Sequence, residues 1–321
     1  MRTPSIPYMG NKGAIAESII NFIRIKHPKA KYFYDMFGGG GAISTQALRQ
    51  GFNVHYNEIQ PRIFNLFEFL IGGNSIPAEW YNWVSREKFF NVIKSDRIDA
   101  YSGMVQQCWS FGNNQKDYLF GRNIEKIKEQ IHYLVVNQSE KAKNVLLAEY
   151  GLNFDIPILP KVYDRYLKEY KQMLKNLKRK IDLQQLQRLE QLERLEQLEQ
   201  LERLEHLERL QQLEQLQQFE HSGNIIICSN LSYKDVVIKT PIDQTVVYCD
   251  IPYQDVKGYA SGMFNRQEFD KWFSENKYSC FLSEYQSDFQ EVFSVDRKVT
   301  LSVSNNSLVK REKLFWNRGN K

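Results

Sequence analysis

"KYFYDMFGGGGAISTQALRQGFNVHYNEI", residues 31–59, predicts a strand, a tight turn, a helix and a second strand in succession. Apolar residues dominate 31–37, glycines occupy 38–41, helix-forming residues follow at 42–50, and 52–59 again has the pattern of a strand. A strand, a helix and a strand joined in this way form the unit from which parallel sheets are built.

The C-terminal part of the chain continues this alternation. Strand-like stretches lie at 224–230, 245–250 and 278–284, and the last of them follows a helical pattern at 266–276. A further helix is expected from Pro61, because proline is favoured at the start of a helix. Alternating strands and helices indicate an α/β fold, in which a mainly parallel sheet carries helices on both faces.

The composition is that of a globular protein, with 321 residues of which 42% are hydrophobic. No stretch is apolar enough to span a membrane and the N-terminus lacks the apolar core of a signal peptide, so we expect a cytoplasmic protein with no membrane partner. Cys108, Cys228, Cys249 and Cys280 are widely spaced, which predicts reduced cysteines that pack in the interior. None of the five histidines has metal-ligand spacing, and we expect no metal site.

The formal charge of +5 is distributed unevenly along the chain. Residues 183–220 contain nine Glu and four Arg, a net charge of −5, so the remaining 283 residues carry +10. A basic surface attracts phosphate backbones, although it is also a common means of keeping a protein soluble. The run of lysines, arginines and tyrosines at 161–180 fits a solvated helix face and a phosphate-contacting face equally well.

A low-complexity segment at 183–223 interrupts the alternation. Leucine stands at every third position from Leu183 to Leu216, and Phe219 continues the series. The composition favours a helix, yet a step of three residues turns each leucine by about −60°, so the leucines spiral around the helix and form no single stripe. We therefore expect an inserted helix or partly ordered arm that holds no catalytic residue, could change in length without touching a catalytic site, and could self-associate.

Two features at the predicted strand ends suggest a nucleoside ligand. Glycines at 38–41, between a strand and a helix, allow a ligand to approach the backbone. The dinucleotide motif G-x-G-x-x-G fails at Ser44, and the phosphate-loop motif fails as well, so a pyrophosphate is not expected. Glu58 ends the second strand, where an acid can accept both hydroxyls of a ribose. A ribose without a phosphate suggests S-adenosylmethionine.

Several motifs occur in the order that one family has. They are PYMGNK (7–12), DMFGGGG (35–41), NEI (57–59), WSFGNNQKDYLFG (109–121), DIPY (250–253), SEY (283–285) and KREKLFWN (310–317). In these motifs the chain resembles the alpha-class N6-adenine DNA methyltransferases, the DNA adenine methylase (Dam-like) family, and among them the phage-type members. The resemblance covers nearly the whole chain except the leucine-rich segment.

The resemblance implies a Rossmann-like, S-adenosylmethionine-dependent methyltransferase sheet in 1–72 and 224–321. It implies a smaller, mainly helical target-recognition region in 73–182, with the leucine-repeat insert in 183–223. The implied reaction is site-specific methyl transfer from S-adenosylmethionine to the N6 amine of an adenine flipped out of double-stranded DNA, as in restriction-modification systems. The implied cofactor-binding residues are Tyr8 against the adenine ring, Lys12 near the carboxylate, Asp35, Phe37 and Gly39 along the methionine half, Glu58 on the ribose, and Asp250.

Asp250, Ile251, Pro252 and Tyr253 are the expected catalytic residues. An adenine amine is a poor nucleophile because its lone pair is delocalised into the ring, so it must be drawn toward tetrahedral geometry. Asp250 and the Ile251 carbonyl can accept its two hydrogens, while Pro252 fixes the turn and Tyr253 stacks on the base. A carboxylate directly after an apolar run, with no cation beside it in the sequence, is costly unless it has a function. The family has proline where Ile251 stands, which predicts a looser turn and slower transfer.

Five polar residues are candidates for contact with DNA. Asn113, Asn114 and Gln115 could bind base edges, and Lys116 and Arg122 could bind phosphates. The same stretch could equally form a polar hairpin tip without DNA contacts.

Three other functions remain open at this point. A cytosine-N4 methyltransferase shares the chemistry but usually has Ser in place of Asp250. A noncatalytic DNA-binding or assembly protein could keep a degenerate methyltransferase core, although four residues argue against it: Lys12, Asp250, Pro252 and Tyr253. A dinucleotide-dependent oxidoreductase is disfavoured by the missing glycine.

Overall fold

The chain forms two compact units. The computed structural model describes residues 3–150, 152, 205–219, 223–252, 264–300 and 307–318, without the side chains of 297–300 and 307–310. The sheet unit comprises Met1–Ile76, Asn91–Asp117 and Arg209–Lys321, and the helical unit comprises Pro77–Phe90 and Tyr118–Glu208. The basic run at 161–180, the leucine repeat up to residue 204, and Tyr253 lie outside the described residues.

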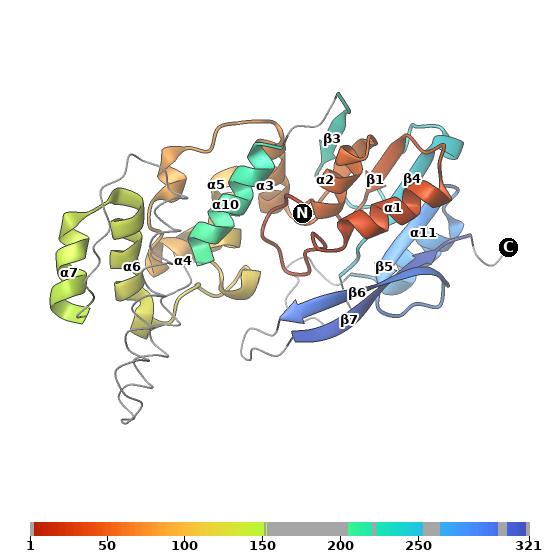
Figure 1. The fold of residues 1–321 in the computed structure, drawn as a ribbon. Coiled ribbons are helices and arrows are strands. Elements are labelled where there is room, and N and C mark those ends of the chain that lie inside the picture. The colour runs from red at the N-terminus through yellow and green to blue at the C-terminus, as the bar shows by residue number, and fades with distance from the viewer. Residues whose placement is uncertain are drawn as a thin grey trace. The chain divides into compact units, whose positions relative to one another are not determined.

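A seven-stranded sheet of order β3-β2-β1-β4-β5-β7-β6 forms the sheet unit (Figure 1). The neighbours from β3 to β5 run parallel, whereas β7 is antiparallel to β5 and β6 is antiparallel to β7. The predicted α/β fold with a mainly parallel sheet is confirmed. The strands are β1 (Tyr32–Asp35), β2 (Asn53–Asn57), β3 (Ile226–Ser229), β4 (Thr245–Cys249), β5 (Ser279–Glu284), β6 (Gln290–Thr300) and β7 (Ser307–Trp316).

The strand order brings the predicted site residues to one edge of the sheet. β1 pairs with β2 on one side and with β4 on the other, so the direction in which successive strands are added reverses beside β1. Asp35 ends β1, Asn57 ends β2, and Asp250 directly follows β4. Ligands of open parallel sheets bind beyond the carboxyl ends of the strands at such a reversal.

One face of the sheet is covered by α1 (Ala16–Lys26), α2 (Ala42–Arg49) and α3 (Pro61–Ile71). Phe22 of α1 meets Phe281 of β5 edge to face, with ring centroids 6.2 Å apart. Phe67 of α3 stacks on Tyr56 of β2 at 3.9 Å. The sequence prediction included the strands and helices of 31–71 but not α1.

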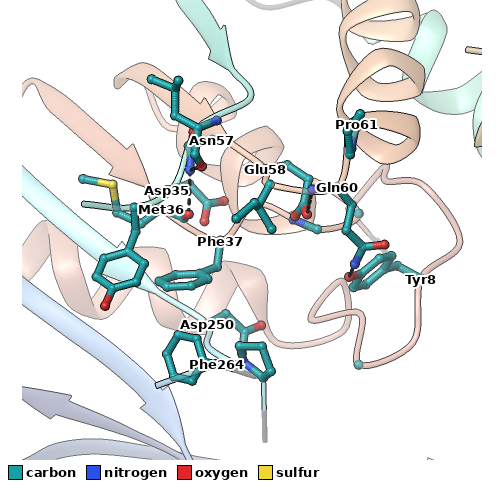
Figure 2. Close-up of a pocket in the computed structure, with 18 of the residues that line it drawn as sticks. Tyr8, Asp35, Met36, Phe37, Asn57, Glu58, Gln60, Pro61, Asp250 and Phe264 are labelled. Carbon is teal, nitrogen blue, oxygen red and sulfur yellow. Dashed lines mark hydrogen bonds between the residues drawn. The ribbon is translucent and has the colours of Figure 1, made fainter. Parts of the chain in front are cut away.

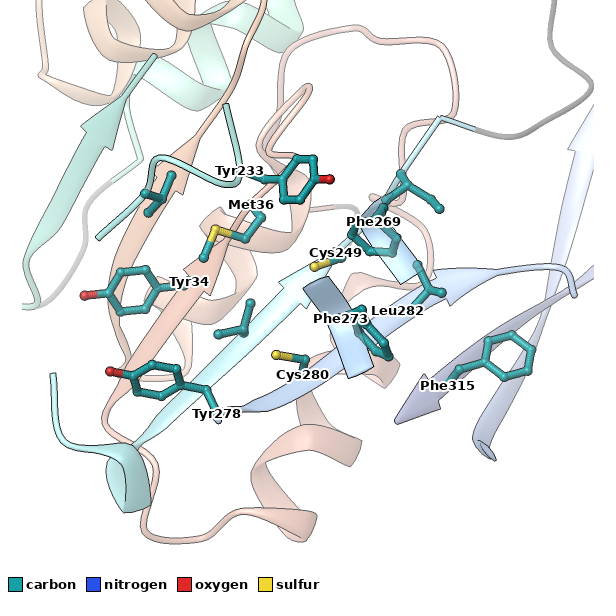
Figure 3. Packing of buried hydrophobic residues seen from close by; sticks show 13 residues of the cluster. Tyr34, Met36, Tyr233, Cys249, Phe269, Phe273, Tyr278, Cys280, Leu282 and Phe315 are labelled. Atoms are coloured by element: carbon teal, nitrogen blue, oxygen red, sulfur yellow. The ribbon is translucent and has the colours of Figure 1, made fainter. Parts of the chain in front are cut away.

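The other face is covered by α11 (Arg266–Glu275), as predicted from its sequence pattern. Because side chains alternate between the two faces of a strand, Tyr34, Val247 and Cys280 all point toward this helix. They form an apolar cluster with its fully buried Phe269 and Phe273 (Figure 3). Burial of such aromatic side chains contributes about 1.5–3 kcal/mol each, so the cluster anchors the strands that end at the site.

Glycines make the turn between β1 and α2 possible. Gly41 has φ +78°, and a Cβ there would lie 2.1 Å from the ring of Phe67. A Cβ on Gly38 would lie 2.1 Å from the ring of Tyr56. Side chains at these positions would clash with the rings, so the backbone reaches this close to β2 and α3 only with glycine.

The last part of the leucine repeat is a buried helix, α10 (Glu205–Gln217). Within the sheet unit, Leu210, Leu213 and Leu216 are fully buried, although successive leucines turn by about −60° around the axis. Burial therefore covers a wide arc of the helix, in line with the predicted spiral, and this part of the repeat is not a surface arm. Arg209 is also buried and donates to the carbonyls of Gln107, Cys108 and Ser110.

These three carbonyls lie at the end of α5 (Ala100–Cys108). Such an end leaves backbone acceptors without helical partners, and Arg209 satisfies them. α5 itself packs closely on α3, because a Cβ on Gly103 would lie 2.3 Å from the carbonyl oxygen of Arg62. The contacts of Arg209 and the packing of α5 on α3 therefore hold the first residues of the polar loop after α5 in place.

The helical unit has its own aromatic core. Trp83 stacks on Phe120 with ring centroids 5.5 Å apart, and the Arg86 guanidinium donates to Glu125 at 2.8 Å. Nδ1 of His132 lies 2.9 Å from Nε2 of His206, and burial lowers the pKa of His132 to about 3. α6 (Arg122–Asn137), α7 (Glu140–Tyr150) and a 3-10 turn at Ala78–Tyr81 lie in this unit, and α4 (Arg86–Lys94) begins in it. The sheet unit has two further 3-10 turns, at Phe111–Asn113 and Ile242–Gln244.

All four cysteines are free. Cys108, Cys249 and Cys280 are buried, as predicted, whereas Cys228 is half-buried. Over the residues that the structure describes, no helix is long and apolar enough to cross a membrane. Within the same residues, no group of His, Cys, Asp and Glu is arranged to hold a metal ion.

Candidate active site

A pocket of about 820 Å³ opens at the carboxyl ends of β1, β2 and β4. Figure 2 shows Asp35, Glu58 and Asp250 around this one cavity, with Phe37 between them. The three acids come from three different strand ends, and the sheet register places those ends side by side. The pocket is large enough for a nucleoside cofactor together with part of a second ligand.

The N-terminal segment forms one wall of the pocket. Ile6 donates its backbone N–H to the Gly40 carbonyl at 2.8 Å, which fixes this segment on the glycine turn. The ring of Tyr8 then lies so close to Gly39 that a Cβ there would be 3.0 Å from it. Tyr8 also accepts a hydrogen bond at its hydroxyl from Nε2 of Gln60 at 3.0 Å. The side chain of Tyr8 is therefore held at the pocket from both sides.

Glu58 is a buried carboxylate that organises the turn after β2. Its Oε2 accepts the N–H of Gly39 at 2.8 Å, and its Oε1 accepts the N–H of Gln60 at 2.8 Å. Burial raises the pKa of Glu58, while these two backbone hydrogen bonds oppose the rise. Each carboxylate oxygen retains a second lone pair, so Glu58 can still accept hydroxyl groups of a ligand.

Asp35 is a buried carboxylate with one unsatisfied oxygen. Ser44 donates its hydroxyl to Oδ2 at 2.7 Å, but Oδ1 makes no hydrogen bond to any described residue. Burial raises the pKa of Asp35 to about 7, with the hydrogen bond from Ser44 opposing the rise. An unsatisfied buried carboxylate oxygen is costly, and a cationic ligand group in the pocket would satisfy it.

Asp250 lies beside a buried cation. Nζ of Lys12 is 3.1 Å from its Oδ1 and 3.2 Å from Oε1 of Glu312 on β7. Ser283 of β5 donates its hydroxyl to that same oxygen of Glu312 at 2.9 Å. The side chains of Lys12 and Glu312 are 2% and 1% exposed, whereas that of Asp250 is 21% exposed and reaches the pocket.

A sequence profile of D12 class N6 adenine-specific DNA methyltransferases matches residues 8–314. The chain belongs to this family. The match runs through every strand end that lines the pocket and confirms the predicted family. A comparison with curated proteins gives no match.

Membership of the D12 class makes the protein a DNA methyltransferase whose family acts on the N6 amine of adenine. Members of the class use S-adenosylmethionine, and two observations fit that cofactor. The free oxygen of Asp35 suits the α-ammonium group of a methionine moiety, and the buried Glu58 suits a ribose.

The structure brings most of the predicted site residues to one pocket. Tyr8, Lys12, Asp35, Phe37, Gly39, Glu58, Asp250 and Pro252 line it. Ile251 is 1% exposed and packs in the apolar cluster, so only its backbone can serve a ligand. Tyr253 lies outside the described residues, and its stacking on a base stays a prediction.

Two aromatic residues of the pocket were not among the predictions. Tyr233 follows the end of β3, and its ring lies 5.3 Å from that of Phe37. Phe264 lies 5.9 Å from Phe37, edge to face. The acids were predicted because they are polar residues at the end of a strand or just past it. The same reasoning could have identified Tyr233, which follows β3. Phe264 precedes a helix, so its position in the sequence does not indicate a site.

The sequence prediction gave no role to Asn57 itself, although the residue is part of the NEI motif. Its amide donates to the carbonyls of Met36 and Leu231, both at 3.0 Å. Its Oδ1 accepts the hydroxyl of Ser229 at 2.7 Å. Asn57 therefore ties the ends of β1, β2 and β3 together beneath the pocket.

The five residues predicted to contact DNA differ in their hydrogen bonds and in their burial. Oδ1 of Asn114 accepts the backbone N–H groups of Lys116 and Asp117, and Asn113 donates its amide to the Gln107 carbonyl. These contacts shape the turn itself. Gln115 is buried, while Lys116 in this unit and Arg122 in the helical unit are exposed. Direct base contact by the amides and phosphate contact by the cations stay predictions.

Proposed function

We propose that the protein transfers a methyl group from S-adenosylmethionine to N6 of an adenine flipped out of double-stranded DNA at a specific site. The observation that carries this proposal is the convergence of Asp35, Glu58 and Asp250 on one pocket from three strand ends. Family membership supports the adenine and DNA parts of the reaction. The electrostatics of the three acids support a cationic nucleoside cofactor beside a separate amine site.

The cofactor half of the pocket consists of the glycine turn and its two acids. We assign the α-ammonium group to Asp35, because that carboxylate has an oxygen without a hydrogen bond. We assign the ribose to Glu58, which the N–H groups of Gly39 and Gln60 hold in place. Tyr8 would close over the adenine ring. When bound, S-adenosylmethionine supplies an electrophilic methyl group on a sulfonium centre.

The amine half of the pocket consists of Asp250 and the turn that follows. The carboxylate of Asp250 accepts one hydrogen of the adenine amine, and the carbonyl of Ile251 accepts the other. Both contacts favour a tetrahedral nitrogen whose lone pair points at the methyl group, and the negative charge stabilises the amine as it becomes cationic. The surplus proton leaves the nitrogen after transfer, so Asp250 need not act as a strong base. Tyr253 would stack on the flipped base.

Incubation with unmethylated DNA and isotopically labelled S-adenosylmethionine, followed by nucleoside mass spectrometry, tests the proposal. We expect labelled N6-methyladenine, and we expect Asp250→Asn to reduce its formation by about 10³-fold or more. Asp243→Asn is the matched control, since Asp243 is exposed at the opposite end of β4. Labelled N4-methylcytosine would redirect the proposal to cytosine, and no labelled base with any DNA would support a noncatalytic core.

A further inference from the structure

Glu312 is a buried acid that the mechanism above does not use. It lies on β7, is 1% exposed, and does not line the pocket. Its Oε1 lies 3.2 Å from Nζ of Lys12 and accepts the hydroxyl of Ser283 at 2.9 Å. The strands hold it firmly, because its neighbour Leu314 pairs with Ser283 across β5 and Glu312 itself pairs with Val295 of β6.

Lys12 needs such a partner for its own burial. A buried ammonium group is strongly destabilising unless oppositely charged groups surround it. Asp250 is one such group, but substrate must engage that carboxylate. Glu312 is the second group and does not line the pocket, so Lys12 keeps an anionic partner when the amine arrives.

The charges of the three groups have a direct consequence for methyl transfer. Lys12 and Asp250 alone would be neutral together, and the ammonium would repel an amine that becomes cationic as it is methylated. With Glu312 the formal charge of the three groups is −1. The negative charge that faces the amine is therefore preserved although a lysine lies 3.1 Å from the carboxylate.

We propose that Glu312 is a positioning residue that anchors Lys12 and maintains the negative charge of Asp250 toward the adenine amine. This inference rests on the proposed function. Ser283 supports it by fixing the acceptor oxygen of Glu312. Because Glu312 does not line the pocket, we expect it to act on the amine through Lys12 and Asp250.

Single-turnover methylation by Glu312→Gln is the test. We expect the rate of methyl transfer to fall by about tenfold or more, while the Kd for S-adenosylhomocysteine stays within about twofold of the wild-type value. Glu291→Gln is the matched control, because Glu291 forms an exposed ion pair with Lys313 at 2.7 Å on the neighbouring strand. It should transfer methyl groups at the wild-type rate.

A double variant separates positioning from a general loss of structure. If Glu312 acts through Lys12, the variant Lys12→Met with Glu312→Gln is no slower than Lys12→Met alone. Rate losses that multiply would overturn the inference, as would an unchanged rate in Glu312→Gln. Should Glu312→Gln fail to fold, Ser283→Ala replaces it, with a smaller loss of rate expected and an unchanged rate counting against the inference. Wild-type protein that methylates no DNA would instead overturn the proposed function.

Discussion

Two acids at neighbouring strand ends, Asp35 at the end of β1 and Asp250 directly after β4, have different electrostatic surroundings. Among the described side chains Asp35 has no ion-pair partner, and burial raises its pKa to about 7. Asp250 has the Nζ of Lys12 at 3.1 Å, and Glu312 stands behind that lysine. Both acids line one pocket (Figure 2).

The difference between the two acids matches the two ligands that we propose. A cofactor that carries an α-ammonium group brings its own cation, so the acid that binds it needs none from the protein. An adenine amine arrives neutral and becomes cationic only during transfer, so its acid must be held ionised and in place beforehand. Each of the following changes tests this difference in electrostatic surroundings, either by altering it or by measuring its consequence for binding or rate.

Among the changes that test this comparison, Lys12→Met should produce the largest effect, because it deprives Asp250 and Glu312 of their shared cation. The two carboxylates then lose the ammonium group that they share, and loss of one member of a buried ionic cluster costs about 3–5 kcal/mol. We expect methyl transfer to slow by about 10²-fold or more and the free energy of unfolding to fall. Single-turnover kinetics and urea denaturation measure the two effects, and wild-type values in both would contradict the charge relationship described here.

Asp35→Asn should weaken cofactor binding and stabilise the fold. Loss of a charge-assisted contact predicts a Kd for S-adenosylmethionine about 10- to 100-fold higher. The folded state holds a proton on Asp35 up to about pH 7, whereas the unfolded chain loses it near 3.8. Stability therefore falls as pH rises through this range, and the variant avoids the fall.

Denaturation at two pH values provides the measurement for this variant. The gain in free energy of unfolding should reach at most about 4 kcal/mol at pH 8 and be smaller at pH 5, because the penalty on Asp35 is then only partly developed. Calorimetric titration with S-adenosylmethionine gives the Kd. Unchanged affinity would assign the ammonium group to another residue.

Cofactor affinity of the wild-type protein should rise with pH around neutrality. With a pKa of about 7, Asp35 is mainly protonated at pH 6 and mainly ionised at pH 8. The fraction that can pair with an ammonium group then increases about tenfold. Calorimetry across this range measures the change, and Asp35→Asn is the control, since it should show a flat profile.

Much of this site could be predicted from local sequence. The apolar runs at 31–37 and 245–249 and the glycines at 38–41 specify two strands and a turn from neighbouring residues alone. In a parallel sheet, residues that follow strands meet at one edge, so Asp35, Glu58 and Asp250 could be expected together before any contact was known.

Long-range contacts could not be predicted in this way. The cation next to Asp250 comes from Lys12, more than two hundred residues earlier, and its second partner Glu312 depends on β7 lying between β5 and β6. Burial of α10 was equally hidden, because a leucine at every third position does not reveal how wide an arc its neighbours cover. These features depend on packing between distant segments.

Ile251→Pro should have the smallest effect and acts on the Asp250 side alone. Proline fixes φ and would hold the carbonyl more rigidly, which predicts methyl transfer up to about threefold faster. Ile251 is 1% exposed within the cluster around Phe269, so its removal from the core should lower the free energy of unfolding by about 1 kcal/mol.

Single-turnover kinetics and denaturation of Ile251→Pro test whether backbone rigidity or side-chain packing matters at the catalytic turn. Pro252→Ala is the matched variant, because it loosens the same turn. A faster rate in the first variant and a slower one in the second would show that backbone rigidity limits transfer. An equal rate in Ile251→Pro would show that the isoleucine imposes no penalty. A slower rate would mean that packing of the Ile251 side chain, and not the stiffness of the turn, positions its carbonyl. Cofactor affinity should be the same in both variants, because the hydrogen bonds from Gly39 and Gln60 to Glu58 hold the other half of the pocket independently of this turn.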